Sequence, residues 1–165
     1  MDVMEVKNGW AWVQSARDGY VGYVEDRHLR QSIENSPATH RVANIGAFVY
    51  PEASIKSTPR MSLSYNSLLR VSAQKNDLYQ LSTGGFVPAA LVAPIDFHAE
   101  EIIAEAFRFL GTPYLWGGRS HMGLDCSALV QLVLQAANHT CPRDSDLQEK
   151  QVGRLVDRDA VQAGE

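Results

Sequence analysis

The sequence lacks the long apolar run that a membrane helix requires. Its longest nearly uninterrupted apolar run, residues 128–137, is broken by Gln131 and Gln135 and is far shorter than the roughly 20 residues that cross a bilayer. The first ten residues, MDVMEVKNGW, carry acids where a signal peptide needs a basic stretch and an apolar core. We therefore expect no membrane partner and a cytoplasmic location.

Basic clusters and a cysteine framework are also missing. Fifteen Lys and Arg residues against nineteen Asp and Glu residues give a net charge of -4, so no basic block is available to neutralise nucleic-acid phosphates. The two cysteines, Cys126 and Cys141, belong to no Cys-x-x-Cys pair and have no histidine at zinc spacing. We expect no nucleic-acid partner, no disulfide framework, no metal and no cofactor.

Two similar hairpin patterns are present. In the first, Trp10 and Trp12 alternate along an extended segment, a turn follows at residues 15–19, and alternation resumes from Val21. In the second, residues 78–81 form a strand, residues 82–85 a turn, and residues 86–87 the start of the next strand. The segment GYVG at residues 19–22 aligns with GFVP at residues 85–88, which indicates an internal repeat of small β-barrels.

This repeat predicts three units. Residues 1–35 are expected to form only the C-terminal part of a first barrel, because the sequence begins at a point where the repeat would already have earlier strands. Residues 39–95 are expected to form a complete second barrel. A linker at residues 36–39 separates them. The third unit, residues 96–165, contains helices. We interpret the aromatic residues of the barrels as core side chains, with a peptide-binding groove as the alternative; they are Trp10, Trp12, Tyr20, Tyr23, Tyr79 and Phe86.

The third unit should open with an amphipathic helix. Asp96 is a candidate N-cap, and the helix should end before Gly111 and Pro113. Three apolar residues recur at helical spacing and are expected to face the core; they are Ile103, Phe107 and Leu110.

A cysteine lies at the start of a second predicted helix. In GLDCSALVQLVLQAAN the apolar residues recur at helical spacing, with Asp125 as N-cap and Cys126 in the first turn. A helix N-terminus favours the thiolate, which is the nucleophilic form. Three glycines upstream would allow a substrate backbone to approach the sulfur; they are Gly117, Gly118 and Gly123. The simpler alternative is a buried cysteine that acts as a small apolar residue.

The surrounding residues resemble a known family. The segment GTPYLWGGRSHMGLDCSALV, residues 111–130, is similar to the signature of NlpC/P60 cysteine peptidases, Gly-x-Pro-Tyr-x-Trp-Gly-Gly and then Gly-x-Asp-Cys-Ser-Gly-Leu-Val. Ala128 stands where that family has glycine. CPRDSDLQ, from residue 141, resembles the family's Pro-Arg-x-Ser-x-x-Gln segment, and the two hairpins resemble the ends of bacterial SH3 (SH3b) domains. The resemblance implies an α+β chain, in which SH3-like β-barrels precede the helical first half of a papain-like NlpC/P60 domain.

The resemblance also implies an activity and a site. It implies hydrolysis of the γ-D-glutamyl bond to a diamino acid in peptidoglycan stem peptides (muropeptides), with Cys126 as nucleophile. Asp125 and Ser127 would face the substrate, Asp125 as the counter-charge of a free N-terminal amine, and the Tyr114 hydroxyl would lie near the thiol. The family's catalytic histidine lies further along the chain than this sequence extends. We therefore expect the chain to be truncated and inactive alone.

The five histidines present are not expected to replace that base. His139 follows the far end of the cysteine helix, and nothing orients His121; the others lie in the barrels or beside the first helix, and they are His28, His40 and His98. Two alternatives stay open: a non-catalytic module that binds cell-wall peptides, and a thiol acyltransferase or amidase of the same superfamily.

Overall fold

The first β unit, residues 1–31, is an antiparallel sheet with the order β1-β2-β3. Its strands are β1 (Asp2–Lys7), β2 (Trp10–Gln14) and β3 (Val21–Glu25). Asn8 and Gly9 join β1 to β2 with φ of 52° and 80°, the positive values that a tight two-residue hairpin turn needs. The predicted hairpin is confirmed, since β2 pairs with β3. The computed structural model describes residues 1–31 and 36–161. The predicted C-terminal ends of the first and third units, residues 32–35 and 162–165, lie outside the described residues.

The second β unit, residues 36–95, surrounds one apolar core with three small sheets. These sheets are β10-β9-β8, β11-β4-β7 and β5-β6, and the core contains Val42, Val49, Val87 and their neighbours. The strands are β4 (His40–Val42), β5 (Gly46–Val49), β6 (Met61–Ser64), β7 (Leu68–Leu69), β8 (Val71–Lys75), β9 (Leu78–Leu81), β10 (Phe86–Pro88) and β11 (Val92–Pro94). The described sheets are not joined into a closed barrel, so the expected barrel closure is not seen.

The internal repeat is visible as a repeated order of elements. In the first β unit, β3 runs directly into the 3-10 turn η1 (Asp26–His28), and in the second, β10 runs directly into η2 (Ala89–Leu91). The residues before the two turns, Glu25 and Pro88, have almost the same φ and ψ, -57° and 126° against -59° and 126°. The two copies therefore end in the same local structure.

The interpretation of the aromatic residues as barrel core is wrong for the first β unit. On β2 the buried residues are Ala11 and Val13, whereas Trp10 is 48% exposed and Tyr23 on β3 is 68% exposed. Tyr20, before β3, is also exposed. The alternation along the strand was predicted correctly, but the opposite face is buried. The aromatic face lines a hollow of about 570 Å³ with Trp12 and polar neighbours from β1 and its turn.

The third unit, from residue 96, consists of short helices and one small hairpin. Its elements are α1 (Ile102–Phe107), β12 (Arg119–Ser120), β13 (Gly123–Leu124), α2 (Cys126–Ala136), α3 (Ser145–Gln151) and the 3-10 turn η3 (Arg158–Ala160). The prediction of Asp96 as N-cap is wrong, because Glu101 occupies that position without a side-chain cap hydrogen bond. None of the described helices is long and apolar enough to cross a membrane.

The predicted core face of α1 is also wrong. Ile103 and Phe107 on α1, and Leu110 beyond its end, are exposed, and Phe109 is buried instead. The Phe109 ring meets the Tyr65 ring of the second β unit edge to face, with ring centroids 5.5 Å apart. Tyr65 and Phe109 belong to one apolar cluster with Ala128 and Leu132 of α2, so the second β unit and the helices share a core.

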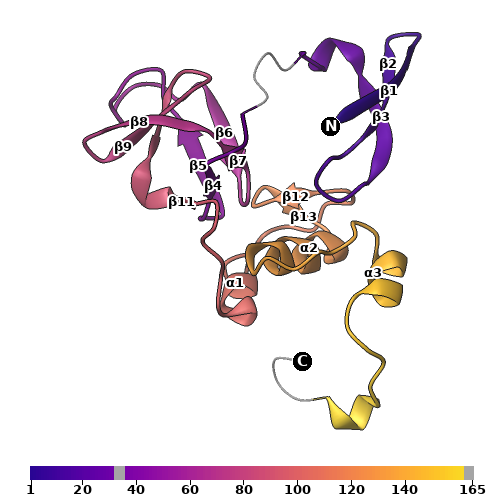
Figure 1. The fold of residues 1–165 in the computed structure, drawn as a ribbon. Coiled ribbons are helices and arrows are strands. Elements are labelled where there is room, and N and C mark those ends of the chain that lie inside the picture. Colours follow the sequence, from indigo (N-terminus) through magenta and orange to yellow (C-terminus); the bar gives the residue numbers. More distant parts are fainter. Residues whose placement is uncertain (32–35, 162–165) are drawn as a thin grey trace.

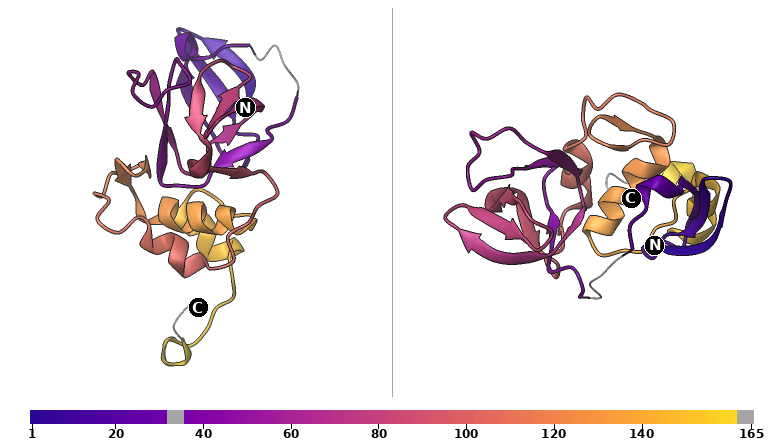
Figure 2. Two further views of the ribbon diagram at one scale, coloured as in Figure 1. Left: turned by 90° about the vertical axis from the view of Figure 1, so that its left-hand side faces the viewer. Right: turned by 90° about the horizontal axis from the view of Figure 1, so that it is seen from above.

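The two β units lie on the same side of α2, with the hairpin of β12 and β13 beside them (Figures 1 and 2). Arg41 of β4 reaches the C-terminal end of α2, where its guanidinium donates to the backbone oxygens of Ala136 at 2.8 Å, Gln135 at 3.4 Å, and Phe97. It also donates to the side chain of Asn66, whose amide group donates to the Leu132 oxygen. The last carbonyls of a helix have no partner within it, and here a cation supplies one.

We predict that Arg41→Met lowers the free energy of unfolding by about 2 kcal/mol, because charged hydrogen bonds to the end of α2 are lost. Urea unfolding followed by circular dichroism measures the change. Arg27→Met is the matched control: its guanidinium is exposed and pairs with Glu25, so the loss should stay below about 1 kcal/mol. Equal losses in the two variants would show that Arg41 does not support the helix end.

Candidate active site

The candidate nucleophile opens helix α2. Asp125 precedes it in an extended conformation, and its side chain accepts a hydrogen bond from the Ala128 backbone N–H at 2.8 Å. This is the predicted N-cap. Cys126 is the first helical residue and is exposed, whereas Ala128 and Leu132 further along α2 are buried. The predicted arrangement, a thiol at the open tip of a helix whose body is buried, is confirmed.

The hairpin of β12 and β13 holds this tip in place. A Cβ atom on Gly118 would lie 2.6 Å from the Gly123 oxygen, and one on Gly123 would lie 2.6 Å from the Leu115 side chain. These two glycines allow the chain to pack against itself, whereas a Cβ atom on Gly117 would have no atom within 4 Å. The approach of a substrate backbone past the three glycines stays a prediction. The Asp125 N–H donates to the Gly118 oxygen at 3.2 Å. The close hairpin thereby fixes the residue before the cysteine.

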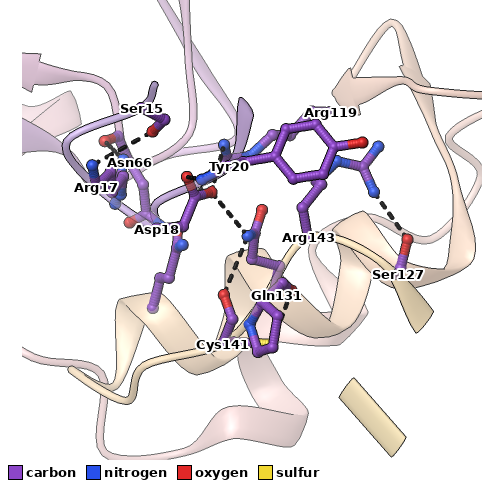
Figure 3. A network of polar contacts seen from close by, with 12 residues as sticks. Ser15, Arg17, Asp18, Tyr20, Asn66, Arg119, Ser127, Gln131, Cys141 and Arg143 are labelled. Carbon is purple, nitrogen blue, oxygen red and sulfur yellow. Dashed lines mark hydrogen bonds and ion pairs between the residues drawn. The ribbon is translucent and has the colours of Figure 1, made fainter. Parts of the chain in front are cut away.

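Arg143 binds Asp125 with both terminal nitrogens of its guanidinium. Nη1 lies 3.0 Å from Oδ1 and Nη2 lies 2.7 Å from Oδ2. Nη1 also donates to Ser127 Oγ at 2.7 Å (Figure 3). The Asp125 and Arg143 side chains are only 11% and 12% exposed. The Arg143 contact lowers the pKa of Asp125 from its ordinary value of 3.8 to about 2. The carboxylate is therefore ionised and fixed at neutral pH.

The Asp125 carboxylate has no acceptor capacity left. Besides the two bonds from Arg143, it accepts from Ser127 Oγ at 3.2 Å, Ala128 N–H at 2.8 Å and Gly117 N–H at 3.0 Å. A carboxylate offers about four acceptor positions, and these donors fill them. The role of Asp125 as counter-charge of a substrate amine stays a prediction, and a substrate would have to displace one of these bonds to meet it.

Gln148 of α3 anchors the segment that carries Arg143. Its side-chain amide donates to the backbone oxygens of Ser127 at 2.8 Å and Pro142 at 2.9 Å, and it is buried. Sequence reasoning assigned no role to Arg143 or Gln148. The CPRDSDLQ segment could have indicated them, because Arg143 and Gln148 occupy the Arg and Gln positions of the family's Pro-Arg-x-Ser-x-x-Gln segment.

The remaining predicted site residues lie around the same tip. Ser127 is 8% exposed and bonded to Arg143 and Asp125, so its hydroxyl lies beneath the surface. Tyr114 is 66% exposed, and its backbone pairs with Leu124, two residues before the cysteine. The structure thus brings Tyr114, Asp125, Cys126 and Ser127 together at one end of α2. Their roles toward a substrate stay predictions.

None of the five histidines, all within the described residues, is placed beside Cys126. His139 donates its N–H to the Leu134 oxygen at the opposite end of α2, and His98 adjoins Ala99, whose N–H also reaches that end. The other three contact the β units: His28 pairs with Glu25, the His40 ring meets Tyr79, and His121 Nδ1 lies 3.2 Å from the Ile45 oxygen.

The loop between β2 and β3 of the first β unit contacts the helical unit. Asp18 accepts a hydrogen bond from the fully buried Gln131 amide of α2 at 3.0 Å, and the same amide donates to the Cys141 oxygen (Figure 3). The Tyr20 hydroxyl lies 3.4 Å from Asp144 Oδ1, next to Arg143. The first β unit therefore contacts α2 and the segment that carries Arg143.

The N-terminal and C-terminal parts of the chain each match a known protein family. Residues 111–165 match the model of the NlpC/P60 family, and residues 1–29 match the bacterial dipeptidyl-peptidase SH3 domain. The resemblance to the NlpC/P60 family is confirmed. The segment of the chain that matches this NlpC/P60 model contains Tyr114, Asp125, Cys126, Arg143 and Gln148.

Named relatives cover most of the chain. It is 30% identical over 158 residues to the gamma-D-glutamyl-L-lysine dipeptidyl-peptidase of Bacillus subtilis, with 89% of this chain and 51% of that protein aligned. It is 28% identical to dipeptidyl-peptidase 6 of Lysinibacillus sphaericus, with 99% and 68% aligned. The crystal structure of an NlpC/P60 family protein from Bacillus cereus superposes with a TM-score of 0.78 at 25% identity, covering 98% of this chain and 59% of that one. The chain spans about half the length of the Bacillus subtilis relative.

The lowered pKa of Asp125 predicts a specific loss of stability in acid. Because the pKa of Asp125 is about 2 in the folded protein and 3.8 ordinarily, its stabilisation is present above about pH 4 and is lost as the pH falls toward 2. The difference in free energy of unfolding between wild type and Asp125→Asn should therefore shrink over that interval. Urea unfolding at several pH values measures it. A difference independent of pH would contradict the role of this ion pair.

The two thiols should differ in reactivity. Cys126 is exposed, whereas Cys141 is 4% exposed and burial raises the pKa of its thiol. We predict that iodoacetamide modifies Cys126 at least about tenfold faster near neutral pH, because the thiolate is the reactive form. Peptide mass spectrometry resolves the two sites in one sample. Equal rates in the folded protein would contradict a special reactivity of the Cys126 thiol.

Proposed function

We propose that this chain carries the nucleophile of a cysteine peptidase that cleaves the γ-D-glutamyl bond to a diamino acid in peptidoglycan stem peptides. The single observation that supports this most is the exposed thiol of Cys126 at the start of α2, behind a fixed Asp125 cap. A thiolate at a helix N-terminus is stabilised by the helix dipole. The names of the relatives supply the peptide class.

In the proposed reaction, Cys126 Sγ attacks the γ-carbonyl carbon of the glutamyl residue. A thioester bond forms, the amide C–N bond breaks, and the proton of the thiol ends on the departing amine. Water then hydrolyses the thioester, which releases the γ-carboxylic acid and restores the thiol. Backbone N–H groups in the first turn of α2 are suited to hold the oxyanion of each tetrahedral intermediate.

Proton transfer needs a base, and the described residues place no imidazole beside Cys126. We therefore expect little or no turnover by the 165 residues alone, whereas formation of a bond between the sulfur and an activated electrophile needs only the thiolate. This same observation supports a second candidate function, a module that binds cell-wall peptides without cleaving them. The two candidates differ in whether a bound peptide reaches the sulfur.

Two carboxylates near Cys126 are candidates for binding the free N-terminal amine of a short peptide. Asp144 is half-buried next to Arg143, and its carboxylate lies 3.4 Å from the hydroxyl of the exposed Tyr20. Asp125, in contrast, is saturated by its donors. Of these two carboxylates, Asp144 has the capacity to accept an ammonium group. We place the counter-charge of the substrate amine there, which revises the assignment to Asp125.

A peptide-directed electrophile tests the proposal without turnover. L-Ala-γ-D-Glu with a terminal chloromethyl ketone should label Cys126 about tenfold faster than its N-acetylated form, because a charged contact contributes about 1.5–3 kcal/mol. Asp144→Asn should remove this preference. Asp146→Asn is the matched control, since Asp146 pairs with Lys150 on the exposed face of α3. Labelling is followed by mass spectrometry.

Three outcomes are distinguishable in that experiment. Equal labelling by the γ-D-Glu reagent and its γ-L-Glu diastereomer would contradict the proposed substrate. Saturable protection by free stem peptide, without labelling by any of the reagents, would support the binding module. A preference for the free amine that survives Asp144→Asn would move the counter-charge to another residue while leaving the peptidase proposal in place.

A further inference from the structure

Arg143 is the one cation that reaches both residues flanking the nucleophile among the described contacts. It binds Asp125 on one side of Cys126 and Ser127 on the other, at distances of 2.7–3.0 Å. Its own position is fixed from outside α2, because Gln148 holds the preceding Pro142 through a hydrogen bond. The guanidinium is thus a rigid clamp across the first turn of the helix.

The titratable groups around this turn belong to five different segments. Asp125 caps α2, and Tyr114 lies in the loop that pairs with Leu124. Arg143 and Asp144 precede α3, Tyr20 lies on the loop of the first β unit, and Arg119 lies on β12. Arg119 is directed to Asp18 and Gln135. The Asp125 carboxylate, adjacent to Cys126 in the chain, is therefore balanced mainly by Arg143.

We propose that Arg143 is a positioning residue for Cys126. Arg143 holds and neutralises the Asp125 carboxylate, so that Asp125 caps the helix without destabilising the Cys126 thiolate by like-charge repulsion. A cap at this position must be an acceptor, and an ionised carboxylate is a strong one. A bare carboxylate beside the thiol would, however, disfavour the thiolate by like-charge repulsion. The bidentate pair retains the cap and removes the repulsion.

Without an arginine, the Asp125 carboxylate would cap the helix but would also repel the thiolate. The Asp125 side chain is only 11% exposed, so water screens its charge poorly. Its three other donors, two backbone N–H groups and one hydroxyl, are neutral. Of the five donor bonds, the two from Arg143 are those that cancel the charge as well as satisfy the acceptor.

The test measures the pH at which alkylation of Cys126 is half-maximal, by iodoacetamide and peptide mass spectrometry. Arg143→Met should raise this midpoint by about one pH unit, because an uncompensated carboxylate then lies one residue from the thiolate. Asp125→Asn keeps a capping side chain but leaves Arg143 unpaired, and should lower the midpoint by a similar amount. The double variant should return to within about 0.3 units of wild type. The midpoint is preferable to the rate, because a less acidic thiol is a better nucleophile.

Cys141 reports on folding in the same samples, since it is buried in the native structure. If Arg143→Met exposes Cys141, Asp125→Asn carries the test. A merely structural role would alter stability and leave the midpoint of the folded protein unchanged, and an unchanged midpoint in the folded variants overturns the proposal. The inference rests on the proposed nucleophile role of Cys126, but it needs no substrate. Failed peptide labelling with shifted midpoints would reject the proposed function alone.

Discussion

The unpaired backbone groups at the two ends of α2 are the constraint on which the structure depends. A helix leaves its first N–H groups and last C=O groups without partners. At the N-terminal end, Asp125 accepts from Ala128 and is itself held by Arg143. At the C-terminal end, Arg41 of the second β unit donates to Ala136. The two ends therefore tie the helix to different parts of the chain, and the placement of Cys126 depends on those ties.

The features that the sequence predicted correctly are local. The Asp125 cap involves a partner three residues away, and the hairpin of β2 and β3 closes through the bond from Ser15 to Tyr20. Short-range hydrogen bonds of this kind depend on residue types within one turn. The exposure of Cys126 follows from its place before the first buried turn. The resemblance of residues 111–130 to the NlpC/P60 signature then supplied the chemistry.

The features that were missed or wrong depend on distant contacts. Alternation along β2 shows that two faces exist, but the rest of the fold decides that Ala11 is buried and Trp10 is exposed. The face of α1 was misjudged similarly, because Tyr65, 44 residues before Phe109 in the sequence, selects Phe109 as its partner. The Arg143 contact with Asp125 spans 18 residues. No periodicity within one element reports such contacts.

The contact between Asp18 and Gln131 has a consequence for the order of events during synthesis. These residues are 113 positions apart, so at ordinary translation rates the hairpin loop leaves the ribosome roughly 6 to 23 seconds before its partner. During that interval the Asp18 carboxylate is hydrated by water and does not yet accept a hydrogen bond from Gln131. The sheet of β1 to β3 is thus made before its partner on α2, and it must be protected without that contact until α2 has emerged.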